Sequence, residues 1–185
     1  MEKNFYNLKD IDVPNLYETH GLKVGNNVVV GEEVMIGEDV TIGHNVIIGT
    51  DVTIGHGTKI GANVEIRDNI TIGNNCKIDS GVIMTGLATV EDNVVLRNHV
   101  VVARGSFVGS NTFIAPKVMF NNLDAEGNSI GGATVGKDCF IGTGAVLQHG
   151  IEIADGTTVG ACSFVSKDIN KAGVYLGVPA KIKLK

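Results

Sequence analysis

Apolar residues recur at every sixth position through most of the chain. Stepping by six from Val24 to Phe120 meets seventeen residues, and all are apolar although hydrophobic residues make up only 43% of the sequence. Six is neither the 3.6-residue period of a helix nor the two-residue period of a strand. These positions are Val24, Val30, Ile36, Ile42, Ile48, Ile54, Ile60, Ile66, Ile72, Ile78, Met84, Val90, Leu96, Val102, Val108, Ile114 and Phe120. The fixed period indicates a repeat architecture in which each hexad is one structural unit.

A second pattern marks where each unit turns. The position four residues after the apolar anchor is usually small or β-branched, as at Val28, Val34 and Thr58. The position three residues after the anchor is Asn, Asp or Gly in twelve of sixteen repeats, and these types tolerate a left-handed backbone. Each hexad therefore predicts a short strand and a corner. We expect three hexads to close one triangular coil, with coils stacked through parallel ladders about 4.8 Å apart.

The period is interrupted once. It breaks after Phe120 and resumes at Val135, a separation of one hexad plus nine residues. We interpret the extra residues as a loop extruded from one corner of an all-β fold. The expected organisation is an N-terminal cap (1–23), a β-helix (24–170) with its loop (121–134), and a short C-terminal tail (171–185).

Composition narrows the function classes. The net charge is −5, which gives no electrostatic support for nucleic-acid binding. Three cysteines without a paired spacing favour a reducing, cytoplasmic environment over a disulfide framework. The opening "MEKNFYNLKD" has no apolar segment typical of a secretory signal, and no run of 18 apolar residues predicts a membrane span.

Four turn positions before the loop depart from the repeat, and such departures often mark functional sites. They are Glu33, Leu87, His99 and Lys117. His99 and Lys117 are 18 residues apart, so they should lie on the same corner, one coil apart. Asn98 precedes His99. The alternative is that both side chains are simply tolerated at an exposed turn.

The loop gives a second candidate. If nine residues are inserted, His149 lies one coil beyond Asn122, on the corner where the loop leaves. A histidine beside a polar loop is a candidate general base, and its alternative is an exposed turn histidine. His44 and His56 have ordinary neighbours and are interpreted as solvated surface. The His99 corner and the loop corner are too far apart to share a site within one chain, so they would meet only between neighbouring chains.

The repeat resembles that of the hexapeptide-repeat family, whose fold is a left-handed parallel β-helix. The segment Val135–Lys183 resembles the closing coils of its acyl-CoA-dependent members, with a "V-x-K-D" corner and a "G-x-P-A-K" loop. The resemblance implies that this end of the chain binds coenzyme A. Lysines near the C-terminus suit its phosphates, the alternative being a solvated basic tail. The matching positions are Gly142, Gly144, Gly160, Ala161, Lys167 and Lys181.

Upstream, "VLRNHVVVARGSFVGSNTFIAPKVMFNNLD" resembles a motif of N-acetyltransferases that act on nucleotide-linked amino sugars. Asn98 and Asn122 fall on asparagines of that motif, while His99 replaces an Asn and Asp124 stands one place late. The resemblance implies substrate-binding roles for Asn98, Asn122, Asp124 and Glu126. It also implies a homotrimer with sites at the grooves between subunits.

These observations favour an acetyl-CoA-dependent acyltransferase that modifies an amine or hydroxyl of a sugar or nucleotide-linked amino sugar. His149 or His99 would be the base, with His149 favoured and His99 expected to act more on acceptor binding, and no metal is expected. A non-catalytic β-helix that serves as a scaffold is the alternative. A gamma-class carbonic anhydrase, which shares the fold, is disfavoured because no two of the five histidines lie five residues apart.

Overall fold

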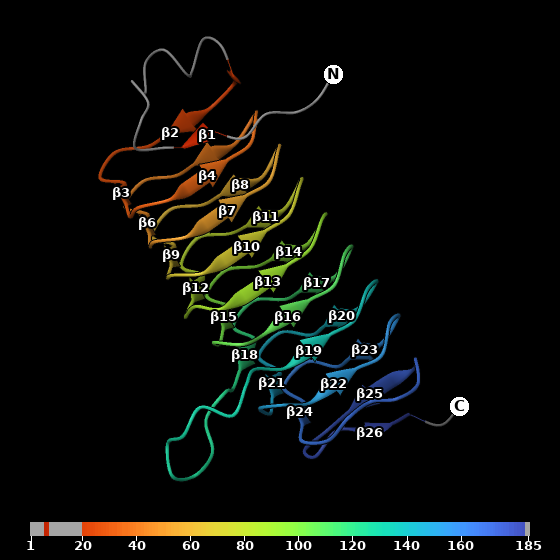
Figure 1. Cartoon of the computed structure of the whole chain (residues 1–185). Coiled ribbons are helices and arrows are strands. Elements are labelled where there is room, and N and C mark those ends of the chain that lie inside the picture. Colours follow the sequence, from red (N-terminus) through yellow and green to blue (C-terminus); the bar gives the residue numbers. More distant parts are fainter. Residues whose placement is uncertain (1–5, 8–19, 184–185) are drawn as a thin grey trace.

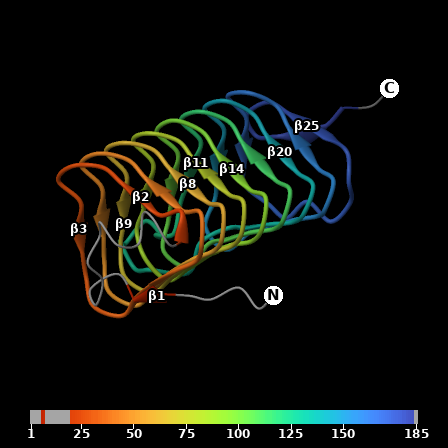
Figure 2. The same ribbon diagram turned by 90° about the horizontal axis from the view of Figure 1, so that it is seen from above.

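The computed structural model in Figure 1 describes residues 6–7 and 20–183, and its strands wind into coils stacked along one axis. Each full coil contributes one strand to each of three sheets, here called A, B and C. Figure 2 shows the coils from above, one behind another. The strands pair with strands of the preceding and following coils in parallel, as expected for a left-handed parallel β-helix. The predicted fold class is therefore confirmed.

The strands are two or three residues long and follow in order around the prism. Sheet A contains β1 (Tyr6–Asn7), β4 (Val34–Ile36), β7 (Val52–Ile54), β10 (Ile70–Ile72), β13 (Ala88–Val90), β16 (Phe107–Val108), β19 (Thr134–Val135) and β22 (Glu152–Ile153). Sheet B contains β2 (Lys23–Val24), β5 (Thr41–Ile42), β8 (Lys59–Ile60), β11 (Lys77–Ile78), β14 (Val95–Leu96), β17 (Phe113–Ile114), β20 (Phe140–Ile141), β23 (Thr158–Val159), β25 (Val174–Leu176) and β26 (Lys181–Ile182). Sheet C contains β3 (Val29–Val30), β6 (Ile47–Ile48), β9 (Glu65–Ile66), β12 (Ile83–Met84), β15 (Val101–Val102), β18 (Met119–Phe120), β21 (Val146–Leu147) and β24 (Phe164–Val165).

The sixfold pattern fills the inside of the prism. From Ile36 onward the apolar anchors are buried, and Ile54, Leu96 and Ile141 have no exposed surface. Burying one such side chain contributes about 1.5–3 kcal/mol, so the stacked anchors form one continuous core. The glycine after many anchors allows the coils to approach closely. A Cβ atom on Gly43 would lie 2.6 Å from the carbonyl carbon of Gly61 in the next coil.

The corners from Asn27 to Lys117 are each fixed by a left-handed residue. All sixteen turn positions between Asn27 and Lys117 have positive φ, including the four that depart from the Asn, Asp or Gly pattern. Leu87 has φ 43°, His99 59° and Lys117 61°. The backbone therefore turns in the same way whatever the side chain. We name the corners AB, BC and CA after the sheets that they join.

The loop leaves corner CA between β18 and β19. Phe107 pairs with Thr134 and Phe120 with Leu147, so the interrupted coil is nine residues longer than an uninterrupted one. This register confirms the predicted insertion. The loop protrudes at the lower left of Figure 1 and closes on itself through a bridge between Leu123 and Ser129.

The two ends of the prism differ. At the N-terminal end β1 pairs antiparallel with β4, whereas most of the predicted cap (residues 1–5 and 8–19) lies outside the described residues. At the C-terminal end β25 continues sheet B in parallel, and β26 pairs with it antiparallel. In the part of the chain that is described, no helix has the length and apolar character needed to cross a membrane.

The three outer faces have different chemistry. The outward positions of sheet A are largely threonines, and those of β2, β8 and β11 in sheet B are lysines. Sheet C instead presents an apolar row that only Glu65 interrupts. We call this row the sheet C stripe. It consists of Val29, Ile47, Ile83, Val101, Met119, Val146 and Phe164.

Candidate functional site

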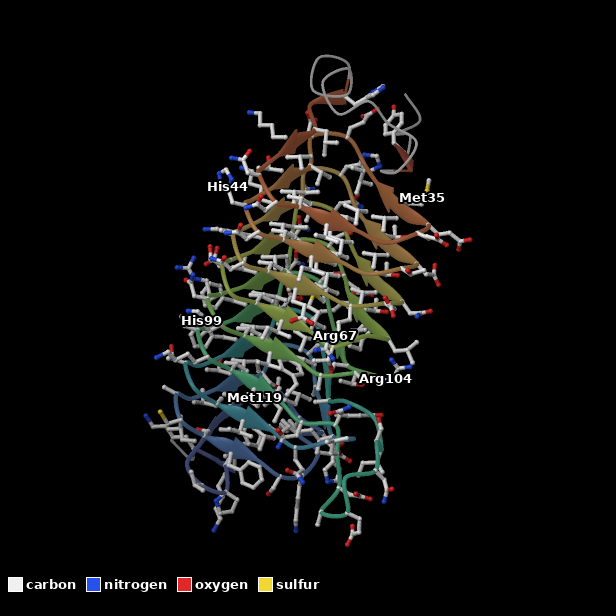
Figure 3. The ribbon with its side chains drawn as sticks, turned by 90° about the vertical axis from the view of Figure 1, so that its left-hand side faces the viewer. Met35, His44, Arg67, His99, Arg104 and Met119 are labelled. Carbon is white, nitrogen blue, oxygen red and sulfur yellow. The ribbon has the colours of Figure 1, made fainter. Side chains whose placement is uncertain are left out.

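Corner BC carries the first group of predicted site residues. Asn98 and His99 connect β14 to β15, and His99 is exposed (Figure 3). The Nδ1–Cε1 edge of its imidazole covers Gly81 one coil away, because a Cβ atom on that glycine would collide with both ring atoms. The Asn98 amide donates a hydrogen bond of 3.4 Å to the Ser80 carbonyl. The corner thus holds an amide and an imidazole side by side at the surface.

The corner loses its regular ladder where these residues begin. Asn27 donates to Asn45 at 3.0 Å, and Asn45 donates to Asn63 at 3.3 Å. The next two positions of this column are Gly81 and His99. The asparagine ladder therefore stops two coils before His99. In the preceding coil the imidazole has a glycine, Gly81, as its neighbour instead of an asparagine.

The predicted coenzyme A glycines lie farther along the same corner. The register places Gly144 one coil after Lys117, and Gly160 and Ala161 one coil later. Gly142 is buried, and a Cβ atom there would lie 2.5 Å from the Ala161 nitrogen. A Cβ atom on Gly160 would collide with Leu176. The fold itself therefore requires glycine at Gly142, where the clash is with backbone, a position that sequence reasoning had attributed to a ligand alone, whereas at Gly160 the exposed Leu176 side chain could move aside.

Gly144 differs from the other two glycines. Its φ is +68°, and a Cβ atom would meet only the Cys162 sulfur, at 3.6 Å. The backbone at this point is therefore open to an approaching group. This open corner, one coil from Lys117, is the part of the predicted cofactor site that fits an extended ligand lying along the coils.

Corner CA carries the second group, which contains Asn122, His149 and Lys167. The pairing of β18 with β21 and of β21 with β24 places them in one column. Asn122 accepts a backbone hydrogen bond of 2.9 Å from Ile130 at the root of the loop. It also lines a groove of about 230 Å³ with Met119. His149 is half-buried and Lys167 is exposed.

The predicted site residues thus fall on two corners at opposite edges of sheet C. Asn98, His99, Gly144 and Ala161 share corner BC, whereas Asn122, His149 and Lys167 share corner CA. In Figure 3, which faces sheet C, His99 lies on the left edge and Arg104 of corner CA lies to its right. Lys181 belongs to neither group, because it lies in β26 on sheet B.

The two loop carboxylates have different surroundings. Asp124 accepts hydrogen bonds from the backbone nitrogens of Glu126 (3.0 Å) and Asn128 (2.8 Å) and from the Asn128 amide (3.0 Å). The Asn128 side chain, followed by these backbone donors, holds the pKa of Asp124 below its usual value. Asp124 therefore stabilises the turn of its own loop, while the Glu126 side chain is exposed.

Two other histidines have roles within the fold. The Nδ1 atom of His44 accepts a hydrogen bond of 2.9 Å from the Asn26 nitrogen, and that of His56 accepts one of 2.9 Å from the Glu38 nitrogen. His56 is only 6% exposed, so its interpretation as solvated surface was wrong. Its ring folds against the backbone of the preceding coil, which an outward turn position does not reveal. Across the described residues, His, Cys, Asp and Glu side chains form no group of three suited to a metal ion.

The cysteines differ in reactivity. Burial raises the pKa of Cys76 to about 11 and raises that of Cys139 as well. A thiol with a raised pKa is a poor nucleophile, because the thiolate is the reactive form. Cys162 is exposed at corner BC. The two buried cysteines therefore contribute packing.

Sequence reasoning missed a basic cleft beside Asn98. The cleft has a volume of about 340 Å³ and is lined by Lys59, Lys77, Asp79 and Arg97, among others. Lys59 and Lys77 are 18 residues apart, the spacing of one coil. A search for like charges at that spacing would have found them.

Comparison with known proteins identifies the family. The sequence pattern described as "bacterial transferase hexapeptide (six repeats)" matches residues 21–56, 51–86 and 132–167, which is more than half of the chain. The chain belongs to the bacterial hexapeptide transferase family.

The chain is also similar to curated acetyltransferases. Galactoside O-acetyltransferase of Escherichia coli (strain K12) is 32% identical over 84 residues, covering 40% of this chain and 41% of the relative. A chloramphenicol acetyltransferase of Morganella morganii is 39% identical over 51 residues, covering 28% of this chain and 24% of the relative. The chain therefore matches less than half of the length of either relative.

Solved structures of other transferases share the fold at low identity. LpxA of Bacteroides fragilis, a UDP-N-acetylglucosamine acyltransferase, has a TM-score of 0.65 at 21% identity, covering 88% of this chain and 72% of its own. PerB of Caulobacter crescentus, in complex with CoA and GDP-perosamine, has a TM-score of 0.55 at 22% identity, covering 87% of this chain and 58% of its own. At this identity the similarity establishes the β-helix.

Proposed function

We propose that this protein is an acyl-CoA-dependent acyltransferase that acetylates an amine or hydroxyl of a sugar or nucleotide-linked amino sugar. The observation that carries the proposal is the alignment of Asn98 and His99 with the open backbone at Gly144 along one corner. The acetyltransferase names of the relatives support the reaction class. The GDP-perosamine bound to PerB supports the acceptor class.

The reaction joins the acceptor nitrogen or oxygen to the acyl carbon and breaks the carbon–sulfur bond, so that coenzyme A leaves as the thiolate. The chain must hold the acceptor and remove its proton. We assign proton acceptance to the exposed imidazole of His99, which lies beside Asn98 and on the corner of Gly144. The Asn98 amide would orient the acceptor. A general base contributes roughly 10²–10⁴-fold to the rate.

His149 is the second candidate base. It lies on corner CA, across sheet C from Gly144 in the same coil. The face is about 15–20 Å wide, from six residues at roughly 3.3 Å each less the corners, so His149 reaches Gly144 only from another subunit. Lys167 lies on the same corner and would accompany His149, whereas Lys181 would approach the co-substrate from the tail.

We further propose a homotrimer held together by the sheet C stripe. Exposed apolar rows of this length are uncommon on monomers and mark interaction surfaces. Val29 is 61% exposed, Ile47 51% and Met119 39%. In a ring of three copies with sheet C facing the axis, corner BC of one copy adjoins corner CA of the next. This arrangement would unite the two groups of predicted site residues.

The oligomer is tested by light scattering. We expect a mass three times 19.4 kDa. Ile47→Asp and Met119→Asp should each shift the mass toward the monomer, because a buried unpaired charge opposes association. Met35→Asp, on the outer face of sheet A, is the control. A monomer at micromolar concentration before any substitution would refute the trimer.

The activity is tested by release of thiol from acetyl-CoA with a panel of sugars, amino sugars and nucleotide sugars. All variants should also carry Cys162→Ser, because the exposed thiol would react with the reagent that detects released thiol. We expect His99→Ala to lower kcat by roughly 10²–10⁴-fold with the fold intact. Full activity in both His99→Ala and His149→Ala would assign the proton to the departing thiolate instead.

Thermal unfolding provides a test that needs no acceptor. Binding to the native state alone stabilises it by about 2.7 kcal/mol at a hundredfold excess over Kd. We expect acetyl-CoA to raise Tm, and Lys181→Ala or Lys167→Ala to reduce the increase. No shift at millimolar acetyl-CoA would favour a non-catalytic scaffold.

A further inference from the structure

A basic cleft opens on sheet B next to corner BC. Its volume of about 340 Å³ is in the range of small-molecule sites. Lys59, Lys77 and Arg97 contribute positive charge to its walls, and Asp79 contributes the single carboxylate. The lining therefore carries a surplus of two positive charges in a chain whose net charge is −5.

The ion pairs in the cleft do not neutralise its surplus of positive charge. Asp79 is shared by two cations, at 3.0 Å from Arg97 and 3.7 Å from Lys77. Within the described part of the chain, Lys59 forms no ion pair, and its side chain is exposed. One carboxylate thus fixes the positions of two cations, and a third faces the cleft unpaired.

The strand register makes the arrangement unfavourable by itself. Lys59 in β8 lies directly opposite Lys77 in β11. Like charges directly opposite on neighbouring strands destabilise a sheet. A bound anion between the two ammonium groups would turn this repulsion into attraction.

The cleft also offers neutral donors and leads to the proposed acceptor residues. The Ser80 hydroxyl oxygen accepts a hydrogen bond of 3.1 Å from the Ala62 nitrogen, which leaves its own proton to donate. Asn98 forms part of the wall, and His99 follows it in the chain. In Figure 3 the cleft lies between two labelled residues. It starts one coil after His44 and ends at the coil that contains His99.

We infer that this cleft binds a phosphate group of the acceptor, so that the acyl acceptor is a phosphorylated sugar. Lys59, Lys77 and Arg97 hold the phosphate oxygens, Ser80 donates to them, and the sugar extends past Asn98 to His99. The cations span two coil steps, about 10 Å, which accommodates a monophosphate or a diphosphate. The inference rests on the proposed function for the reaction that follows binding.

Coenzyme A also carries phosphates, but the cleft lies on the other side of His99 from the predicted coenzyme site. Gly144 is two coils and Ala161 three coils beyond His99 in the C-terminal direction. Lys77 is one coil and Lys59 two coils away in the N-terminal direction. The two ligands would therefore approach the imidazole from opposite ends of the corner.

The experiment measures anion binding by calorimetry with inorganic pyrophosphate and no acetyl-CoA, at constant ionic strength. The unsubstituted protein should bind, and Lys59→Gln and Lys77→Gln should each weaken binding roughly ten- to hundredfold, the range for hydrogen bonds to charged groups. Lys23→Gln is the matched control. It lies on the same face of sheet B, two coils before Lys59, and should bind as the unsubstituted protein does. Circular dichroism should show that all variants are folded.

Competition identifies the ligand. A sugar phosphate should displace pyrophosphate, whereas coenzyme A should not. Displacement by coenzyme A but not by the sugar phosphate would overturn the inference, and so would equal binding by Lys59→Gln and Lys23→Gln. Acyl transfer to a neutral sugar with KM unchanged in Lys59→Gln would overturn it while the proposed function stands. Pyrophosphate and sugar phosphate binding that depends on Lys59, without any acyl transfer, would support the cleft and refute the proposed reaction.

Discussion

Lys117→Asn should stabilise the protein. Lys117 lies exposed at corner BC with φ 61°, a conformation that costs a residue other than glycine roughly 1–2 kcal/mol. Asparagine relieves much of this cost, because its short side chain suits the left-handed region. The backbone hydrogen bond of 3.0 Å from the Lys117 nitrogen to the Asn98 carbonyl is kept. We therefore expect a gain of about 1 kcal/mol, which raises Tm by about 2–4 °C in a chain of this length.

The reverse substitution is the matched control. Asn69 is also exposed and has φ 58°. Asn69→Lys should lower Tm by a similar amount, since it places at corner CA the strain that Lys117 carries at corner BC. The two variants are compared by circular dichroism or calorimetry on heating. An unchanged or lower Tm in Lys117→Asn, together with no loss in Asn69→Lys, would show that the corner strain is not what we infer.

Lys117→Asn also tests whether Lys117 takes part in acyl transfer. Lys117 lies one coil from His99 and one coil from Gly144. If the lysine contributes to the site, Lys117→Asn should lose acyl-transfer activity while gaining stability, as is common for residues kept for function. Retained activity in the stabilised variant would mean that the lysine is only tolerated at its turn.

Three further predictions concern the core, the coil contacts and the thiols. Phe120→Ala removes one of the largest fully buried side chains and should lower the free energy of unfolding by about 3–5 kcal/mol, measured in denaturant. Gly142→Ala should lower Tm with or without acetyl-CoA, whereas Gly173→Ala, whose added carbon would meet only side-chain atoms of Ile182 and Tyr175 at 3.3 and 3.4 Å, should change it less. One thiol, Cys162, should react quickly at pH 8 in the native protein, since burial raises the pKa of Cys76 to about 11; fast reaction of all three would contradict the buried assignment.

Most of the fold was predictable because a repeat applies one rule many times. The sixfold anchors gave the core, and the turn positions gave the corners even at Leu87, where the side chain breaks the pattern. The nine-residue insertion followed from counting alone. The site was less predictable. The spacing correctly separated the His99 corner from that of His149, but it did not show that Gly142 is required for the contact between coils.

The remaining differences arise from contacts that a linear pattern does not contain. His56 occupies an ordinary outward position, yet its ring turns inward onto the backbone of the neighbouring coil. Asp124 has the charge of a substrate ligand, yet its oxygens are used by its own loop. In the sequence, the cleft is marked only by two lysines, Lys59 and Lys77, that are one 18-residue coil apart. Each lysine alone is an ordinary exposed residue.

The uniform coil has a consequence for how substrate range changes over evolutionary time. Each coil contacts mainly its neighbours, so removing or duplicating one 18-residue unit preserves the local contacts of every other unit. Such an event between Lys77 and His99 would move the His99 imidazole by about 4.8 Å relative to Lys59 and Lys77, the lysines that we propose to bind phosphate. A duplication would then select acceptors of a different length while keeping every side chain that we assign to the acceptor. Gene-level slippage in repeat number, rather than point substitution, is the simplest route by which such a scaffold adjusts its reach.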